Sequence, residues 1–214
     1  MSHWHYYITG SGPGPSPAPV AEHYRWRLCT VMDEQLENRL RFLRDAHTEG
    51  MPHSGRALFD HLLGTRQVLV EWGARPALCD AGLFHSIYST EHYEEKALPL
   101  SRRGEVQQLI GEEAESLVWL FCIMRREAFF QDLGKDRGPA VQHRETGEVI
   151  SLSGTQHQDL LTLLLANSME GFPRCTWFER RSVRMGLRLY RRYAAASVQR
   201  ALDRYAVRWW EIWK

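Results

Sequence analysis

The sequence predicts an all-α fold, a helical bundle with one short β-hairpin. Most long segments of the 214-residue chain repeat their apolar residues at helical spacing. The hydrophobic share of 43% is large enough for a sizeable core. Only the stretch 134–154 breaks the helical pattern, because its residues alternate in polarity on both sides of the turn-forming pair Thr146-Gly147. We therefore expect one two-stranded hairpin inside an otherwise helical chain.

The predicted helices follow one another with recognisable ends. Apolar residues recur at helical spacing in the segments 22–47, 54–73, 76–88, 101–110, 112–130, 155–169 and 177–214, the last long enough for one or two helices. Residues that favour helix ends set the bounds. In order, Gly50 and Pro52 end the first helix, Gly73 ends the second, Pro76 opens the third, Ser101 caps the fourth, Thr155 or Asp159 opens the sixth, and Pro173 begins the next.

The first residues differ in composition from the rest. The run GSGPGPSPAP at 10–19 is too rich in Gly, Pro and Ser to bury a core, so we expect a flexible N-terminal tail over 1–20. A chain of this length suits one large domain. A single helical domain is therefore expected over 21–214.

Charge, hydropathy and cysteine usage argue against several kinds of partner. Lys and Arg number 27 and Asp and Glu 26, so no net field favours nucleic acid. No stretch approaches the roughly 18 apolar residues that span a bilayer, and we expect no membrane partner and a cytoplasmic location. The arginine pairs are interpreted as solvated helix faces: Arg125-Arg126, Arg180-Arg181 and Arg191-Arg192. Reduced thiols are expected at the widely spaced Cys29, Cys79, Cys122 and Cys175.

Three histidines and one asparagine are the candidates for chemistry. His61 and His85 lie on two neighbouring predicted helices, and His53 precedes the first of them. An imidazole can bind a metal ion or act as an acid or base near neutral pH, but a buried, hydrogen-bonded core histidine is the plainer interpretation. Asn167 stands in a leucine-rich helix, where an amide is costly to bury unless it orders a polar network or faces a pocket.

The setting of two of these histidines resembles the HD superfamily, in particular the hydrolase domain of RelA/SpoT-type alarmone enzymes. The pattern H-x(23)-H runs from His61 to His85, and the second histidine follows the apolar run AGLF. The segment LLLANSMEGFPR around Asn167 resembles the helix that carries the last aspartate of that family. The resemblance implies an HD-like helical bundle in which these three residues converge on one pocket.

A longer stretch resembles an uncharacterised family of bacterial proteins. The motifs D-H-L-x-G-T, W-G and A-G-L-F-H-S-x-Y-x-T stand at Asp60–Thr65, Trp72-Gly73 and Ala81–Thr90. The resemblance runs from about His53 to Arg174. It implies a shared fold and a shared pocket, and it brings no known activity.

Neutral residues replace the acidic residues of the HD pattern. Ser86 stands at the aspartate of the His-Asp pair, Asn167 at the last aspartate, and Ser89 and Thr90 at the assisting acidic pair. Such residues hold a hard cation weakly, whereas two imidazoles with one local carboxylate suit Fe or Zn. The nearest carboxylates in the sequence belong to Asp60, Glu91 and Glu170. The cofactor stays open between Fe, Mn or Zn and none, and standard HD phosphohydrolase activity is not expected.

Two functions from different classes follow from these residues. The first is a small-molecule enzyme with a modified HD-like pocket, a divergent metal-dependent hydrolase or oxygenase. Its catalytic residues would be His61, His85 and Asn167, with the two histidines as metal ligands or as acid and base. The second is a non-catalytic protein that holds a small ligand or a nucleotide in the same pocket. Further contacts to the cofactor or ligand are expected from His53, Ser86 and Tyr88.

Overall fold

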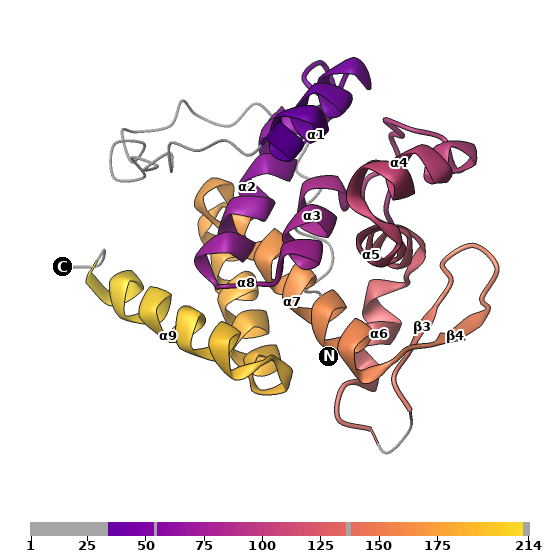
Figure 1. The fold of residues 1–214 in the computed structure, drawn as a ribbon. Helices are drawn as coiled ribbons and strands as arrows, with labels where there is room; N and C mark the ends of the chain where they lie inside the picture. The colour runs from indigo at the N-terminus through magenta and orange to yellow at the C-terminus, as the bar shows by residue number, and fades with distance from the viewer. Residues whose placement is uncertain (1–33, 54, 136–137, 212–214) are drawn as a thin grey trace.

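The structure, a computed structural model, describes residues 34–53, 55–135 and 138–211. Its α-helices are α1 (Glu34–Asp45), α2 (Leu58–Glu71), α3 (Pro76–Phe84), α4 (Arg103–Ile110), α5 (Glu112–Ile123), α6 (Arg126–Asp132), α7 (Gly154–Gly171), α8 (Trp177–Tyr190) and α9 (Ala196–Glu211) (Figure 1). Short 3₁₀ turns are η2 (Leu100–Arg102), η3 (Phe172–Arg174) and η4 (Arg191–Tyr193). The tail predicted over 1–20 and the start of the first predicted helix lie outside the described residues.

The predicted hairpin is present, and the all-α fold class is confirmed. Strand β3 (Ala140–Gln142) pairs antiparallel with β4 (Val149–Ser151), and Gly147 in the connecting turn takes a φ of 74°. A second antiparallel pair, β1 (Pro52–His53) with β2 (Arg56–Ala57), was not predicted. Strands of two residues are too short to show an alternating pattern.

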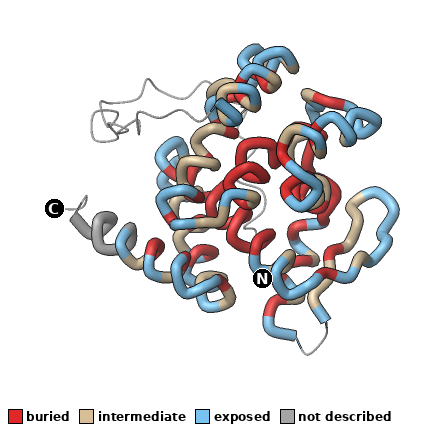
Figure 2. The backbone as a smooth tube through the Cα atoms, in the orientation of Figure 1, coloured by how far each residue is buried: buried red, intermediate tan, exposed pale blue. Residues whose placement is uncertain are grey.

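Helices α2, α3, α5 and α7 form the centre of the molecule. Helix α2 packs against both α3 and α7, and α3 also packs against α5. Every residue from Leu78 to Phe84 in α3 and from Asp159 to Glu170 in α7 is buried, and Figure 2 shows buried backbone gathered at the middle of the fold. Polar side chains in these two helices must therefore find partners inside the protein.

The third helix ends at Phe84, earlier than the predicted end at Tyr88. Turns follow it, and Ser89 takes a φ of 74°, which an L-residue does not adopt inside a right-handed helix. The carbonyl of Ile87 accepts a hydrogen bond from the amide of Leu98, at 3.0 Å. His85 consequently stands just beyond the helix end, where its side chain is set by tertiary contacts.

The helix predicted over 112–130 is divided in two. Helix α5 ends at Ile123 because Met124 has extended backbone, with ψ of 142°, and forms an isolated β-bridge with His143 beside the hairpin. A contact between segments distant in sequence overrides the local helical pattern here. The chain turns helical again at Arg126, the first residue of α6.

Two helix starts also differ from the predicted residues. Helix α7 opens with a capping box, not at Thr155 or Asp159. The Ser153 hydroxyl accepts from the Gln156 amide, and the Gln156 side chain accepts from the Ser153 amide. Ser101, predicted to be a helix cap, lies inside the 3₁₀ turn η2 and caps neither that turn nor α4.

The described part of the chain can be compared with the expectations for membrane-spanning helices and for the cysteines. There, no helix combines the length and the apolar content that crossing a bilayer requires. Cys79 and Cys122 are buried and Cys175 is half-buried, and all three are free thiols. Cys29 lies outside the described residues.

Candidate functional site

Two glycines let the central helices approach one another closely. A methyl group at Gly64 of α2 would lie 2.9 Å from the Glu170 Oε1 and 2.7 Å from an Arg56 guanidinium nitrogen. At Gly82 of α3, a methyl group would collide with the Leu69 side chain of α2. Both glycines belong to the sequence motifs that also contain the two candidate histidines, so the motifs have a packing role as well.

His61 of α2 and His85 face each other inside the core. Their Nε2 atoms lie 3.1 Å apart, and their ring planes meet at 66°. The residues are 3% and 0% exposed, so bulk water does not reach them. Phe121 of α5 packs edge-on against His85, with ring centroids 5.0 Å apart. The structure thus brings together the two histidines that the sequence singles out.

Glu170 of α7 is a buried carboxylate surrounded by hydrogen-bond donors. Its Oε2 lies 2.5 Å from the His61 Nδ1 and 2.6 Å from an Arg174 guanidinium nitrogen, and Arg56 donates to its Oε1. Burial alone would raise the pKa of Glu170, but the hydrogen bond and charge of His61, followed by the charges of Arg174 and Arg56, lower it to about 2. Glu170 is therefore ionised at neutral pH.

The Nδ1 atom of each histidine is a hydrogen-bond donor. His85 Nδ1 lies 2.7 Å from the Gly82 carbonyl oxygen, which can only accept. His61 Nδ1 donates to the ionised Glu170. Burial, and then the charge of His61, hold the pKa of His85 well below 6.5, so His85 is neutral. When both rings are neutral, each Nε2 carries a lone pair, and the two lone pairs face each other.

Asn167 adds a third polar group to the pair. Its Oδ1 lies 3.0 Å from the His85 Nε2. It precedes Glu170 by three residues on α7, so both side chains lie on the face of that helix turned toward α2 and α3. The sequence predicts that the Asn167 amide either orders a polar network or faces a pocket. In the structure it does both, because it contacts His85 and also lines a pocket.

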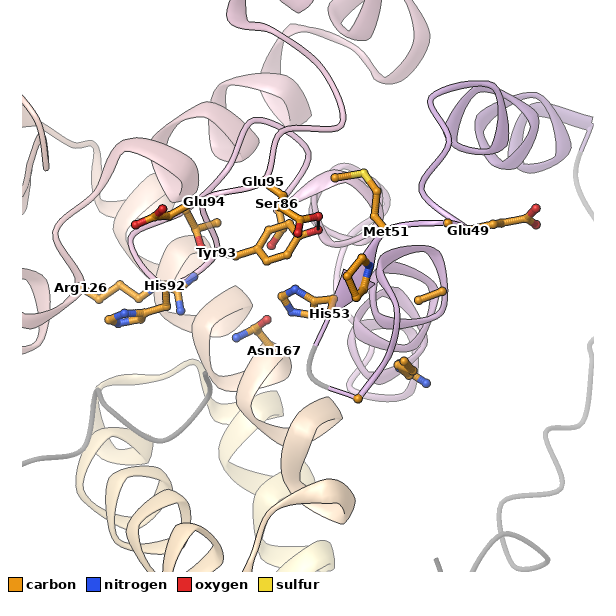
Figure 3. A pocket seen from close by; sticks show the side chains of 16 residues that line it. Glu49, Met51, His53, Ser86, His92, Tyr93, Glu94, Glu95, Arg126 and Asn167 are labelled. Carbon is orange, nitrogen blue, oxygen red and sulfur yellow. Dashed lines mark hydrogen bonds between the residues drawn. The ribbon is translucent and has the colours of Figure 1, made fainter. Parts of the chain in front are cut away.

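That pocket has a volume of about 780 Å³, and Figure 3 draws the side chains that line it. It lies next to the histidine pair, because two of its lining residues, His53 and Asn167, contact His61 and His85. Its walls come from the β1–β2 hairpin, the segment after α3, the start of α6 and the C-terminal half of α7. His53, Ser86, Tyr93, Arg126 and Asn167 are among its lining residues. His61 and His85 do not line it.

His53 separates the pocket from the buried pair. Its ring lies over that of His61, with centroids 4.2 Å apart, and meets the Tyr93 ring edge-on at 4.5 Å. Burial, and then the charge of His61, lower the pKa of His53 to about 3, so this ring is neutral too. Its Nδ1 is buried without a hydrogen-bond partner. A molecule in the pocket therefore meets His53 and Asn167 before it meets the inner histidines.

Arg126 brings a buried positive charge to the pocket wall, which corrects the sequence interpretation of Arg125-Arg126 as a solvated pair. Arg125 is exposed, but Arg126 is only 6% exposed. Its guanidinium lies over the Phe121 ring, 4.8 Å from the centroid. Burial lowers the pKa of Arg126 to about 10, although the charge of Glu91 opposes this effect. The sequence offered no signal for this burial.

The other predicted site residues are divided between the pocket and the core. Ser86 and Thr90 line the pocket. Ser89 instead accepts a hydrogen bond from Arg144, at 2.6 Å. Tyr88 is buried outside the pocket, where burial and then the charge of Glu115 raise the pKa of its hydroxyl well above the ordinary value. The structure thus places Tyr88 away from any ligand in this pocket.

Of the three carboxylates near the candidate site in sequence, only Glu170 contacts the histidine pair. Asp60 is exposed on α2, and Glu91 accepts from the backbone amide of Arg126, at 2.8 Å. The spacing of Asn167 and Glu170, three apart on one helix, was a signal that could have distinguished Glu170 from the other two.

A metal ion at this place would depend on neutral ligands. Among the described residues, no group of three His, Cys, Asp or Glu side chains is placed to hold a metal ion. The available donor set is the Nε2 of His61, the Nε2 of His85 and the Oδ1 of Asn167. Glu170 lies on the opposite side of the His61 ring and supports the set without joining it.

Comparison with known proteins gives one partial match. Residues 42–126 match the model of a family described as Domain of unknown function (DUF6817). The matched segment contains α2 to α5 with both histidines, and it ends before α7 with Asn167 and Glu170. No curated protein and no solved structure matches the chain.

Proposed function

We propose that the chain is a small-molecule enzyme built around a transition-metal site made by His61, His85 and Asn167. One observation carries this proposal. Each histidine donates its Nδ1 hydrogen outward, to a carboxylate or to a backbone carbonyl, and turns its Nε2 toward the other ring. Metal-binding histidines almost always donate their second N–H to partners of these two kinds. When both rings are neutral, the two Nε2 lone pairs face each other at 3.1 Å and repel unless a cation, a proton included, lies between them.

The chemistry of the donor set suits zinc or iron better than magnesium. Imidazole nitrogens are favoured ligands of zinc and iron, whereas magnesium prefers carboxylate oxygens. Three protein ligands also leave coordination positions for water or substrate. When bound, such an ion would activate a water molecule or polarise a substrate group.

Other residues prepare the site for this role. Glu170, itself paired with Arg56 and Arg174, holds the His61 ring in one orientation. His53 covers the His61 ring and limits the access of water. Asn167 stands at the boundary, because its amide contacts His85 and also lines the pocket.

The HD resemblance is part of the same proposal. In that family the first histidine lies on one helix, the second at the next, and the last aspartate on a later helix. His61, His85 and Asn167 follow this order here, which supports an HD-like bundle with an altered ligand set. The altered set supports a divergent hydrolase or an oxygenase over the standard phosphohydrolase.

Metal titration of the purified, chelator-treated protein tests the proposal. We expect Zn²⁺, or Fe²⁺ under anaerobic conditions, to bind at one equivalent. His61→Ala and His85→Ala should abolish this binding. His157→Ala is the matched control, because His157 packs against Phe129 at the start of α7. A folded protein that binds none of Zn²⁺, Fe²⁺ and Mn²⁺ stoichiometrically would contradict the metal site.

A second candidate, a non-catalytic binding protein for a small ligand or a nucleotide, is favoured by a different observation. Neither His61 nor His85 lines the pocket. If the Asn167 amide is turned over, its nitrogen donates to the His85 Nε2 and satisfies that atom without a metal. Metal-free protein that binds a small molecule without converting it would support this candidate.

A further inference from the structure

We infer that the pocket binds a small organic anion with a single carboxylate group, and that Arg126 is the residue that anchors it. The inference deepens the proposed function by naming a substrate class. It rests on that function only for the claim that the anion is converted. The binding itself depends on Arg126 and the pocket wall.

The guanidinium of Arg126 lacks the partner that a buried charge requires. Within the described part of the chain, its side chain forms no hydrogen bond or ion pair, and its Nε is buried without a partner. The nearby carboxylate of Glu91 contacts the backbone amide of Arg126 instead. A buried cation is costly unless it is paired and hydrogen-bonded. An anion in the pocket would supply both interactions.

Arg126 is also held in place before any ligand arrives. The ring of Phe121 lies under its guanidinium, and Arg126 begins α6, two residues after the β-bridge of Met124. A guanidinium fixed in this way presents its parallel N–H groups to a planar carboxylate with little loss of freedom. Met51 and Tyr93 of the same pocket give apolar surface for the organic part of the ligand.

The charges around the pocket favour a ligand that carries a single negative charge. Arg56 is the other cation in the wall, and it is already paired with Glu170. Three exposed carboxylates also line the pocket, those of Glu49, Glu94 and Glu95 (Figure 3). They repel a polyanion more strongly than a monoanion. A polyphosphate therefore fits this pocket less well than a monocarboxylate.

Nuclear magnetic resonance of the ¹⁵N-labelled, chelator-treated full chain tests the inference with benzoate, benzamide and inorganic pyrophosphate as probes. Benzoate should shift the Nε–H resonance of Arg126, which is assigned by its absence from Arg126→Lys. Benzamide, of the same shape but neutral, should bind at least about tenfold more weakly, as expected for loss of a charged hydrogen bond. Arg126→Gln should weaken benzoate binding by a similar factor, and Arg125→Gln, at the exposed neighbour, should not change it.

Three results would overturn the inference: no shift of the Arg126 resonance with benzoate, equal binding of benzoate and benzamide, or tighter binding of pyrophosphate than of benzoate. The wild-type resonance decides between binding and no binding even if Arg126→Gln does not fold. Metal binding is measured separately on the same samples. Benzoate binding by a protein that holds no metal would contradict the proposed metalloenzyme but not this inference. Metal binding without benzoate binding would contradict this inference but not the proposed metalloenzyme.

Discussion

The carboxylate of Glu170 lies 2.5 Å from the Nδ1 of His61, although 109 positions separate the two residues in the sequence. This contact joins α7 to α2, and it sets the orientation of the ring that turns its Nε2 toward His85. The same carboxylate holds Arg56 and Arg174. One buried side chain thus contributes to the stability of the fold and to the geometry of the candidate site.

Replacing this carboxylate should change how stability depends on pH. Because folding lowers the pKa of Glu170 from 4.5 to about 2, its ionised form contributes on the order of 3 kcal/mol to the free energy of unfolding. The folded-state pKa lies below the unfolded value, so this contribution is complete above about pH 5 and is lost as the pH falls toward 2. The Glu170→Gln variant should therefore have a lower free energy of unfolding than the wild type at pH 7. Its free energy of unfolding should also fall less than that of the wild type when the pH is lowered.

Urea unfolding of chelator-treated protein between pH 7 and pH 3 measures this effect. Glu148→Gln, a change at an exposed residue near the hairpin turn, should keep the wild-type pH dependence. If Glu170→Gln and the wild-type protein lost stability in parallel as the pH fell, the assignment of the acid sensitivity to Glu170 would be wrong.

A methyl group at Gly64 should disturb the same contact from the other side. Gly64→Ala would force the Glu170 carboxylate and the Arg56 guanidinium to move, with a cost of about 1–3 kcal/mol for overpacking. Since Glu170 orients His61, metal affinity should fall by about 10- to 100-fold, as for other changes next to a metal ligand. Gly104→Ala is the control, because Gly104 lies in α4 with open space around it. Equal metal affinity of Gly64→Ala and wild type would show that this packing does not support the site.

The helices could be predicted because helical periodicity is a local property of the sequence. Several of their ends could not be predicted to the residue, because tertiary contacts set them. Met124 illustrates this, since its bridge to His143 stops α5 within a segment of continuous helical pattern. The start of α7 was missed for a different reason: the capping pair of Ser153 and Gln156 is visible in the sequence as S-x-x-Q, but it precedes the apolar residues on which the prediction relied.

The part of the candidate site that could be predicted is the part that the family resemblance identified. That resemblance singled out His61, His85 and Asn167 and implied that they converge. It could not identify Glu170 as the partner of His61, because this choice depends on how α7 docks on α2. It also could not show that Arg126 is buried while Arg125 is exposed, because both belong to the same charged dipeptide and only the fold distinguishes them.

A second buried carboxylate, far from the pocket, separates stability from function. Glu115 of α5 is 0% exposed and accepts two hydrogen bonds from Arg103, at 2.6 and 2.7 Å. Arg103 is 30% exposed and the glutamine oxygen can still accept from it, so Glu115→Gln should lower the free energy of unfolding by about 1–3 kcal/mol, the usual cost of weakening a hydrogen-bonded ion pair. Metal affinity, measured under conditions where the variant stays folded, should match that of the wild type. A parallel loss of metal binding would mean that the site responds to general destabilisation, which would weaken the conclusions from Gly64→Ala.

Hydrolysis of guanosine tetraphosphate with Mg²⁺ or Mn²⁺ should be absent. This reaction requires anionic ligands to hold the ion and a carboxylate to position the water, and Ser86 and Asn167 are neutral. The Ser89 hydroxyl is already bonded to Arg144. Incubation of the purified protein with the alarmone and Mn²⁺, followed by an assay for pyrophosphate, checks this expectation. Release of pyrophosphate that disappears in His61→Ala would show that another carboxylate had taken over the missing role.

Restoring one negative charge should strengthen the binding of divalent cations. Asn167→Asp replaces an amide with a carboxylate of nearly the same shape, 3.0 Å from the His85 Nε2, and therefore adds attraction to a divalent cation without altering the packing of α7. We expect Mn²⁺ affinity to rise by at least about tenfold, a change of about 1.4 kcal/mol in binding free energy. Asn38→Asp, at an exposed position of α1, adds the same charge to the chain at a distance from the site and should leave Mn²⁺ affinity unchanged. Isothermal titration calorimetry on chelator-treated samples compares the Mn²⁺ affinities of the wild type, Asn167→Asp and Asn38→Asp. If the two variants bind Mn²⁺ equally, the gain is a general effect of charge, and Asn167 is not a ligand of the ion.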